Sequence, residues 1–470
     1  TLAAELGVDP SPETETLYLN IRKQIDCQGA DGSIQQMPGA PARTASTLPG
    51  QVTPFFGRDR EQRAIDLVLR DRRGRLITIF GVGGSGKTRL ALAVGEKQAQ
   101  TIERDGDFRF PDGVFFAALE TVESAAEIIP TLCQALGFQP ADEIQTGRSK
   151  EAQLLEYLRH KRLLLIIDNF EQLLDGVGQL AKIHRSAAQV HLLVTSRQKL
   201  SLQGERLYAL EGLLYPQTGD EATDAQQLLS HYPAAALFVS GARRVRAGYQ
   251  LQDEDTAHLI QLCRLVDGLP LALELAAGWT NVLSLADIVD EIAQGLSFLQ
   301  SDLHDLPDRH RSMEAVFDVT WRRLTEAEHV SFAHVSVFRG GFSREAAALA
   351  GRASLSQLAA LANKALIEFD KKQDRYQTHR LLHQFGTASL AHDPVVEREA
   401  RSRHSAYFCD ALQQWNNQLK GADQLQALAE LDKDSANARA AWNYAAATGK
   451  IAELDAAADG LSRSYLWRRR

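Results

Sequence analysis

The sequence has 470 residues, 44% hydrophobic and 24% charged, which is the balance of an ordinary globular protein of about three or four domains. Its formal net charge of −8 argues against a chain whose main surface binds nucleic-acid phosphates, because such surfaces collect Lys and Arg. The longest aliphatic run, Leu163–Ile167, is far shorter than the ~20 residues of a membrane span. The four widely separated cysteines contain no C-x-x-C pair and predict free thiols of a reducing cytosol, with neither disulfides nor zinc.

The N-terminal part predicts two helices followed by a linker. The chain begins at Thr1 without a charged-then-apolar leader, so we interpret it as a fragment of a longer, cytoplasmic protein. Leu2–Lys23 has helical sequence on both sides of a break at Gly7–Pro12. Residues 26–52 are rich in Gly, Pro, Ser and Ala, and they predict a flexible linker between residues 1–25 and the next domain.

Residues 53–216 predict an α/β domain with a parallel sheet. Short apolar runs alternate there with helical or loop sequence, as βαβ units require. The runs are Leu76–Phe80, Val114–Leu119, Leu163–Ile167 and His191–Thr195.

A phosphate-binding loop follows the first of these strands. The string GVGGSGKT at Gly81–Thr88 satisfies G-x-x-x-x-G-K-[ST], and it joins a predicted strand to the predicted helix Arg89–Ala99, as this P-loop motif requires. Glycines let successive backbone N–H groups face an anion, and the helix directs its positive end at the phosphates. We predict that Lys87 reaches the β- and γ-phosphates and that Thr88 binds Mg²⁺. The predicted nucleotide-binding residues here are Gly81, Val82, Gly83, Gly84, Ser85, Gly86, Lys87, Thr88 and Arg89.

An acidic residue at the end of a buried strand completes such a site. Asp168 ends the run LLLIID and is the predicted second Mg²⁺ ligand. The acidic residue that usually follows, and orients the attacking water, is replaced by Asn169, so hydrolysis should be slow unless Glu171 substitutes. The next strand ends at Arg197, whose guanidinium we expect to sense the γ-phosphate. Lys87, Asp168 and Arg197 are therefore the candidate catalytic residues of a slow ATPase at most.

Residues 217–470 are predominantly helical, with one β-rich exception. Met313, Val316, Phe317 and Leu324 lie at helical spacing on one apolar face. Ala365–Gln377 predicts a β-hairpin that turns at Lys371–Asp374. We divide this part into a helical domain at 217–305, a hairpin-containing domain at 306–392 and amphipathic, Ala-rich helices at 393–470.

Adenine is the expected base. Guanine specificity requires N-K-x-D, and the nearest string, Asn363–Leu366, lacks the Asp and lies outside the α/β region. The expected ligands are therefore ATP and ADP with Mg²⁺.

The order of these motifs resembles the NB-ARC branch of the signal-transduction ATPases (STAND), over about Thr53–Leu390. FFGRDRE at Phe55–Glu61 is similar to the family's entry motif, which implies that Phe56, Gly57 and Arg58 border the adenine. GLPLAL at Gly268–Leu273 is similar to the helical-domain motif, whose proline, here Pro270, packs near the base.

His379, in the string QTHR, occupies the place of the family's M-H-D histidine. The resemblance implies that it contacts the β-phosphate of ADP, although Thr378 and Arg380 replace the usual Met and Asp. His379 and His383 are also spaced four apart on a predicted helix. This spacing alone does not predict a metal site, because neither a general-base Glu nor a third ligand is evident.

Three further stretches are similar to parts of bacterial regulators in this family. Arg311–Phe342 is similar to their winged-helix domain (306–392), here a switch element. Leu2–Arg22 resembles the last helices of a bacterial transcriptional activator domain, which implies an upstream DNA-binding domain outside this chain. Arg403–Phe408 and Asp434–Trp442 are similar to the first helices of a TPR-like sensor domain (393–470).

The resemblance implies a regulatory switch that is closed with ADP and opens with ATP to form a self-oligomer. An inducer would act at the C-terminal repeats, slow hydrolysis would reset the switch, DNA would be reached only through the upstream domain, and no membrane is involved. A dedicated P-loop ATPase or kinase is one alternative, and a switch with a defence effector is another. Sequence upstream of Thr1 would separate the transcriptional switch from the switch with a defence effector.

Overall fold

The chain divides into two compact units, Thr1–Arg43 and Thr44–Arg470. The computed structural model describes parts of the second unit only, with side chains as far as residue 463: residues 45–71, 74–102, 108–217, 224–300, 311–422 and 424–468. The predicted N-terminal helices and most of the predicted linker therefore lie outside the described residues.

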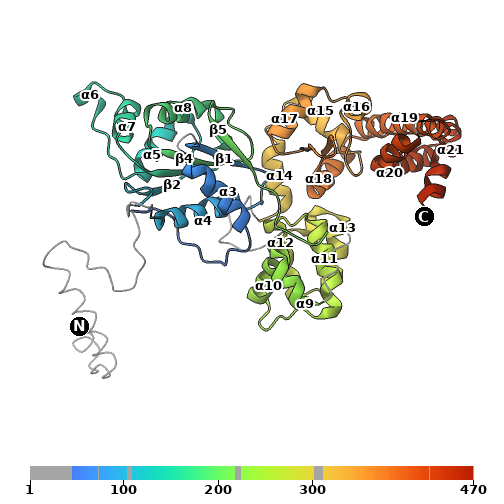
Figure 1. Ribbon diagram of the computed structural model, residues 1–470, viewed down its shortest axis with the longest axis horizontal. Helices are drawn as coiled ribbons and strands as arrows, with labels where there is room; N and C mark the ends of the chain where they lie inside the picture. Colours follow the sequence, from blue (N-terminus) through green and yellow to red (C-terminus); the bar gives the residue numbers. More distant parts are fainter. Residues whose placement is uncertain are drawn as a thin grey trace. The chain divides into compact units, whose positions relative to one another are not determined.

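A parallel sheet of five strands, in the order β2-β3-β4-β1-β5, forms the centre of the α/β region (Figure 1). The strands are β1 Leu76–Phe80, β2 Val114–Ala118, β3 Leu164–Asp168, β4 His191–Ser196 and β5 Glu205–Ala209. The predicted parallel sheet is thus confirmed, and its predicted strands are correct to within one residue at each end. The sequence analysis missed β5, an edge strand beside β1 whose side chains are mostly exposed, so that no apolar run marks it.

Helices cover both faces of this sheet (Figure 1). Those on one face are α3 Asp59–Arg70 and α4 Lys87–Ala99; those on the other are α5 Ile128–Ala135, α7 Lys150–Leu158 and α8 Val177–Ser186, with the short α6 Glu143–Thr146 between α5 and α7. Alternate residues of β3 serve the two layers, because successive side chains of a strand point to opposite faces. Leu164 and Ile166 join the α3–α4 core, whereas Leu165 and Ile167 join the other.

The last part of the predicted flexible linker is attached to the sheet. Ala45 and Thr47 exchange backbone hydrogen bonds with Val114 at the free edge of β2, and Leu48 packs into the α3–α4 core. The prediction of flexibility is therefore wrong for these residues. Composition could not show it, because their partners lie about seventy residues away.

Residues 224–391 are helical apart from one hairpin. The helices are α9 Ala225–His231, α10 Pro233–Val245, α11 Thr256–Leu265, α12 Pro270–Gly278, α13 Leu285–Gln294, α14 Met313–Trp321, α15 Glu326–Val335, α16 Arg344–Leu349, α17 Leu355–Asn363 and α18 Arg380–Ala391. Short 3-10 turns occur at Ala125–Glu127, Phe170–Gln172, Leu174–Gly176, Asp253–Asp255, Trp279–Asn281 and Leu296–Phe298. The predicted hairpin is confirmed as antiparallel strands β6 Glu368–Asp370 and β7 Arg375–Gln377. His379 does not lie inside a helix as predicted; it is the N-cap of α18.

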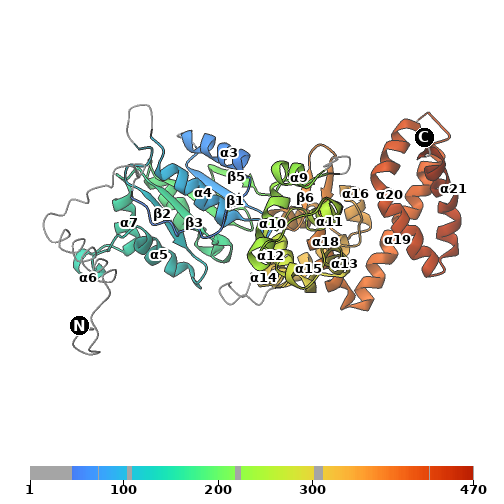
Figure 2. The same ribbon diagram turned by 90° about the horizontal axis from the view of Figure 1, so that it is seen from below.

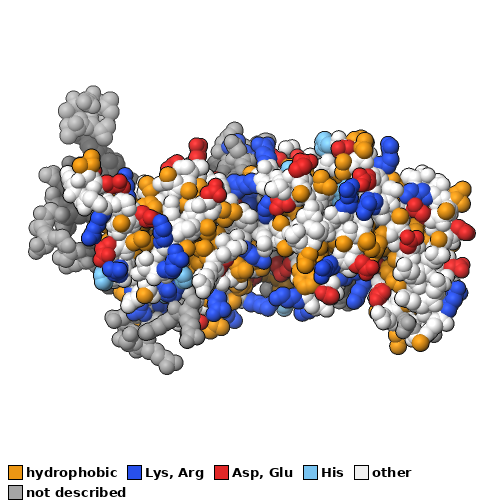
Figure 3. Space-filling view, turned by 90° about the horizontal axis from the view of Figure 1, so that it is seen from above, with side chains coloured by type: hydrophobic (Ala, Val, Ile, Leu, Met, Phe, Trp, Pro, Cys, Tyr) orange, Lys and Arg blue, Asp and Glu red, His pale blue; other side chains and the backbone are white. Residues whose placement is uncertain are grey.

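The C-terminal helices α19 Pro394–Gln418, α20 Gln424–Ala447 and α21 Ile451–Arg468 lie side by side (Figure 2). They confirm the predicted helical tail. None of the described helices is long and apolar enough to cross a membrane. Cys133, Cys263 and Cys409 are buried free thiols, as predicted, and Cys27 lies outside the described residues. On the face in Figure 3, basic and acidic side chains are interspersed.

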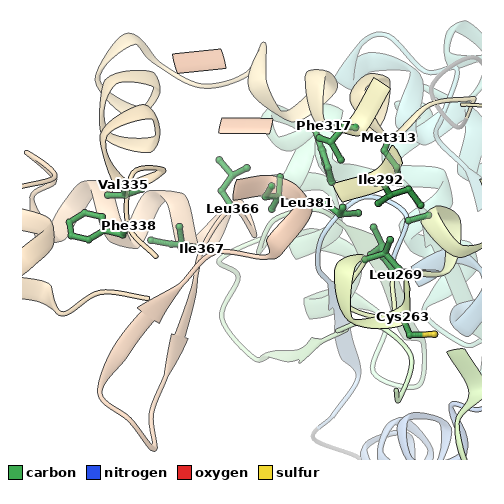
Figure 4. Close-up of a cluster of buried hydrophobic side chains, with 14 of the residues drawn as sticks. Cys263, Leu269, Ile292, Met313, Phe317, Val335, Phe338, Leu366, Ile367 and Leu381 are labelled. Atoms are coloured by element: carbon green, nitrogen blue, oxygen red, sulfur yellow. The ribbon is translucent and has the colours of Figure 1, made fainter. Parts of the chain in front are cut away.

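One continuous apolar core runs from α9 to α21. The predicted apolar face of α14 forms part of it, since Met313, Val316 and Phe317 are all buried. Figure 4 shows Met313 and Phe317 near Ile292 of α13 and Leu381 of α18. Burial within this core fixes the position of α14, which also contacts the P-loop.

A buried polar cluster joins the hairpin to α20. Arg375 of β7 forms a bidentate ion pair with Asp434 of α20, with N–O distances of 2.6 and 2.9 Å. The fully buried Asn437 donates to Asp434 Oδ1 and to Gly341 O, and it accepts from the backbone of Arg339. Removing one partner from such a pair costs about 3–5 kcal/mol, because the other charge is then buried without a partner. The packing of α20 against the hairpin therefore requires both residues.

His404 of α19 adds a pH-dependent element to this cluster. Its Nε2 lies 3.3 Å from Asn437 Oδ1, and burial lowers its pKa to about 4. Because the folded pKa is depressed from 6.5, the unfolded chain binds a proton that the folded chain does not between pH 6.5 and 4. His404 therefore lowers the free energy of unfolding as the pH falls from 6.5 to about 4.

We predict that His404→Gln, whose amide can still donate to Asn437, reduces this acid sensitivity. The pH slope of the free energy of unfolding should fall by up to about 1.4 kcal/mol per pH unit between pH 6 and 5. Urea unfolding at pH 7, 6 and 5 measures it. The exposed His160→Gln should keep the original slope, and an equal slope in both variants would contradict the assignment.

Candidate functional site

The backbone of the P-loop is built to face an anion. Gly81–Gly86 connects the central strand β1 directly to α4, which begins at Lys87. Gly84 and Gly86 have φ angles of 82° and 87°, in the left-handed region that L side chains rarely adopt. The turn therefore depends on glycine, and it leaves the first N–H groups of α4 at the carboxyl end of the sheet.

Lys87 lies inside the curve of the loop. Its ammonium group donates to Gly81 O at 2.9 Å and to Val82 O at 3.0 Å. The Ser85 hydroxyl is also buried in the loop. A cation held among glycine backbones at a helix N-terminus suits the phosphates of a nucleotide.

The end of β3 brings a carboxylate to the same place. Asp168 Oδ1 accepts from the Thr88 hydroxyl at 2.8 Å and from the Thr195 hydroxyl at 2.5 Å. Burial raises the pKa of Asp168, and the nearby Glu171 raises it further. A divalent cation beside Asp168 would favour the ionised carboxylate. The Thr88 hydroxyl and Asp168 are the oxygen donors that Mg²⁺ prefers, so these residues fit the predicted ion.

The residues after Asp168 do not supply a ready general base. Asn169 is in the left-handed conformation (φ 66°), with its N–H on Thr195 Oγ1 at 3.0 Å. Glu171 is buried and forms an ion pair with Arg197 Nε at 3.1 Å. Thr195 therefore orients both Asp168 and the Asn169 backbone, while the Glu171 carboxylate is paired with Arg197.

Arg197 connects the sheet to α14. Its Nη1 donates to Val316 O at 2.5 Å and to the Thr320 hydroxyl at 2.9 Å. The guanidinium also lies against Gly83 of the P-loop, where an added β-carbon would overlap Val316. Gly83 thus permits a close approach, and α14 lies directly on the phosphate-binding loop.

The start of α12 contacts the next loop residue. Leu271 N donates to Gly84 O at 3.3 Å, and Pro270 lies beside Gly86. The structure therefore places Pro270 and Leu271 against the P-loop, whereas the predicted contact of Pro270 with the base stays a prediction.

His379 is joined to the same turn through Asp267. Its Nδ1 lies 3.5 Å from Asp267 Oδ2 and accepts from Leu381 N–H, while Asp267 also accepts from Arg380 N–H at 2.7 Å. Its Nε2 is shielded from solvent, without a hydrogen-bond partner among the described residues. Burial lowers the pKa of His379, which favours the neutral ring with its proton on Nε2. Among the described residues, no cluster of three or more His, Cys, Asp and Glu could hold a metal ion.

Arg58 ties the entry motif to the P-loop. Its guanidinium donates to Ser85 O at 3.1 Å and to the carbonyls of Glu211 and Gly212. Gly57 packs on Pro233 at the start of α10. Phe56 lines a cavity of about 440 Å³ together with Pro54 and residues of α9 and α10. Arg58 therefore positions the entry motif by its hydrogen bonds, and the Phe56 side chain borders the cavity.

Arg89 faces away from the loop carbonyls. Its guanidinium donates to the backbone carbonyls of Thr53 and Pro54, at 2.7 and 3.2 Å, and to the Thr53 hydroxyl. It also lies over the Phe55 ring. Arg89, one of the predicted nucleotide-binding residues, is thus hydrogen-bonded to Thr53 and Pro54, which directly precede the entry motif.

Sequence reasoning missed the residues that cover the loop. Val316 and Thr320 carry no local signal, because they contact Arg197 from more than a hundred residues away. Asp267 directly precedes the predicted motif Gly268–Leu273 and Leu271 lies inside it, so that motif could have indicated both. The structure brings the P-loop, Asp168, Arg197 and Pro270 together, and connects His379 to them through Asp267.

The chain is similar to ATPases and to named regulators. A family model described as an AAA domain matches residues 70–202. A Mycobacterium tuberculosis protein named "Putative HTH-type transcriptional regulator" is 27% identical over 391 residues, which cover 81% of this chain and 41% of that protein. An uncharacterised M. tuberculosis protein is 28% identical over 341 residues, which cover 71% of this chain and 79% of that protein. The chain thus spans about two-fifths of the length of the named regulator.

A solved structure with detectable similarity comes from Pyrococcus horikoshii. It is a signal transduction ATPase with numerous domains (STAND) that has a tetratricopeptide repeat sensor. Its identity is 17%, its TM-score is 0.31, and the match covers 91% of this chain and 60% of that chain. A Walker-type ATPase of Pyrococcus abyssi matches with 13% identity and a TM-score of 0.43, over 71% of this chain and 96% of that chain.

We predict that Lys87→Ala weakens ADP binding by about tenfold to a hundredfold, since one charge-assisted phosphate contact contributes about 1.5–3 kcal/mol. Titration of a fluorescent ADP measures the affinity. Lys97→Ala, at an exposed position of the same helix, is the matched control. Unchanged affinity in a folded Lys87→Ala protein would exclude the P-loop as the phosphate site.

Proposed function

We propose that this chain is the ATP- and ADP-binding switch of a bacterial transcriptional regulator. In this proposal ADP holds α12 and α14 closed over the P-loop, and ATP opens them for self-association. The observation that carries the proposal is the direct contact of both helices with the phosphate-binding loop. Arg197 joins α14 to the end of β4, and Leu271 N joins α12 to Gly84 O.

The described contacts suggest how the nucleotide lies. The P-loop glycines, Lys87 and Thr88 would hold the phosphates, and Phe56 and Pro270 would border the base. Val82, Ser85 and Arg58 would maintain the shape of this pocket. His379 Nε2, on the opposite side of the ring from the Nδ1 that lies near Asp267, is the buried donor that we assign to the β-phosphate. When bound, Mg²⁺ would neutralise phosphate charge between Thr88 and Asp168.

The switch is assigned to Arg197. Each charge-assisted hydrogen bond contributes about 1.5–3 kcal/mol, so the bonds to Val316 O and Thr320 are similar in size to those that a γ-phosphate would offer. Moving a two-state equilibrium from 1:99 to 99:1 takes roughly 5.5 kcal/mol of differential binding. Displacement of the guanidinium from α14 towards a phosphate would supply a large share of this difference.

Slow hydrolysis follows from the same contacts. Asn169 cannot accept a proton from water, and Glu171 is paired with Arg197. While Arg197 holds α14, it also holds the one nearby carboxylate that could replace the missing base. Turnover would thus act as a reset. A dedicated enzyme is less well supported, because α12 and α14 meet the P-loop and Arg197 with the side chains of Leu271 and Val316, two backbone groups and the Thr320 hydroxyl, none of which is ionisable.

The output is assigned by similarity to the named mycobacterial regulator. The arrangement of α15, α16, α17 and the hairpin, in which Phe342 pairs with Tyr376 of β7, suits a winged helix within the switch. The paired helices α19–α21 suit the beginning of a TPR-like sensor for an inducer. DNA contact would belong to a separate domain.

We predict that Thr320→Val speeds ADP release, because it removes one contact of Arg197 with α14 while leaving Arg197 available to nucleotide. Loss of a hydrogen bond to a charged group should raise the rate by about tenfold. Chase of a fluorescent ADP with unlabelled ADP gives the rate. Arg322→Ala, an exposed arginine one residue beyond α14, is the control. Equal release from both variants would remove α14 from the switch.

A further inference from the structure

Residues 45–54, which precede the entry motif, are attached at two places. Residues 45–48 contact β2 and the third turn of α4, and Thr53 and Pro54 contact the first turn of α4. At the sheet edge, Val114 N donates to Ala45 O at 2.9 Å, Thr47 N to Val114 O at 3.2 Å, and Phe116 N to the Thr47 hydroxyl at 3.0 Å. These bonds satisfy N–H and C=O groups that an edge strand otherwise leaves open. Residues 45–48 thus extend the sheet beyond β2.

Leu48 anchors the segment to α4. Its methyl groups lie over Gly95, where an added β-carbon would come within 3.1 Å of Leu48 and 2.6 Å of Ile166. Gly95 is buried in the third turn of α4. The absence of a side chain there leaves the space that Leu48 fills between the helix and the sheet.

Arg89 fastens the other end of the segment. Its guanidinium is bonded to the carbonyls of Thr53 and Pro54 and to the Thr53 hydroxyl. Arg89 directly follows Thr88, in the first turn of α4. The stretch between the anchors is exposed, and the Val52 side chain in particular is 98% exposed.

The anchors define the path of the segment along α4. Gly95 and Arg89 are six residues apart, which is about 9 Å along a helix. Leu48 and Thr53 are five residues apart and can span at most about 17 Å. The segment thus runs along α4 from its third turn back to the phosphate-binding end, then continues to Phe56.

We propose that residues 45–54 are a strap whose attachment is thermodynamically coupled to nucleotide binding at the P-loop, with Arg89 as the positioning residue that joins the two. The proposal rests on the proposed nucleotide site. Lys87 and Thr88 bind phosphate and Mg²⁺ in that function, so the adjacent Arg89 is in the turn that must hold its place when the nucleotide is bound. A fixed first turn favours the bonds from Arg89 to the strap.

The coupling has a direction. The strap is the covalent connection from the N-terminal residues to the nucleotide-binding domain. Tighter attachment to α4 in the nucleotide-bound state therefore fixes the point at which the chain enters this domain. Because coupling is reciprocal, complete detachment of the strap must weaken nucleotide binding by the factor by which bound nucleotide favours attachment, and partial loosening weakens it by up to that factor.

Hydrogen exchange in the full chain measures the first half of this relation. The amides of Thr47, Val114 and Phe116 report attachment, since each donates within the strap contact. With saturating ADP and Mg²⁺ their exchange should slow by about fivefold or more, the lower end of usual coupling. Unchanged exchange at these amides, in a protein that demonstrably binds ADP, would overturn the proposal.

Distal variants measure the second half. Leu48→Ala and Thr47→Val loosen the strap far from the phosphates, and each should weaken ADP binding several-fold. Val52→Ala changes an exposed residue of the same strap and should leave the affinity unchanged. Arg89→Ala should abolish the nucleotide effect on the three amides, and Arg89→Lys should restore part of it.

The outcomes separate the two proposals. If the wild-type protein binds ADP, and the Leu48→Ala and Thr47→Val variants bind ADP as tightly as Val52→Ala does, the strap proposal is wrong and the nucleotide site stands. Wild-type protein that binds no ADP overturns both. If Arg89→Ala weakens ADP binding while the nucleotide still slows exchange in the strap, Arg89 is a phosphate ligand and not the positioning residue.

Discussion

The close approach of α14 to the P-loop is the contact on which the account depends. Val316 packs so closely on Gly83 that a side chain at position 83 would overlap it. Arg197 adds hydrogen bonds to Val316 O and the Thr320 hydroxyl. The same guanidinium is paired with Glu171, three residues after Asp168 at the end of β3. One side chain therefore links the position of α14 to the carboxylates of the site. A phosphate that draws the guanidinium away changes both.

Two routes connect this contact to more distant parts of the described chain. On the C-terminal side, Asp434 of α20 holds Arg375 of β7, and four residues later His379 contacts Asp267, which precedes the turn bonded to Gly84. On the N-terminal side, the strap runs along α4. Each route passes through buried or hydrogen-bonded groups. Changes at α20 or at residues 45–54 are thus placed to reach the P-loop.

The sequence predicted the parts of this site that are local. The P-loop could be read from a string of eight residues, and Asp168 from the apolar run before it. The strands beneath them could be read because both faces of the sheet are buried, so most residues in each run are apolar. Edge strand β5 has mostly exposed side chains and left no such signal. Residues 45–48 have the composition of a linker, yet backbone hydrogen bonds, which do not depend on side-chain type, attach them to β2.

The closing contacts were beyond sequence reasoning for a different reason. Val316 was predicted correctly as part of an apolar helical face, but its carbonyl, not its side chain, accepts from Arg197. Nothing in a helix sequence indicates which carbonyl receives an outside donor. The assignment of Arg89 failed to foresee its partners because an arginine after a P-loop is equally suited to phosphate and to backbone carbonyls. Only the fold placed Thr53 and Pro54 within its reach.

The distance between the α/β region and α14 tests the central claim most directly. Spin labels on cysteines introduced at the exposed positions Arg185 of α8 and Glu314 of α14, with the buried thiols retained, would report it by pulsed electron resonance. The account predicts a single narrow distance with ADP and Mg²⁺, and a longer or broader distribution with a non-hydrolysable ATP analogue. The same narrow distribution with both nucleotides, each shown to be bound, would contradict a switch that opens at α14.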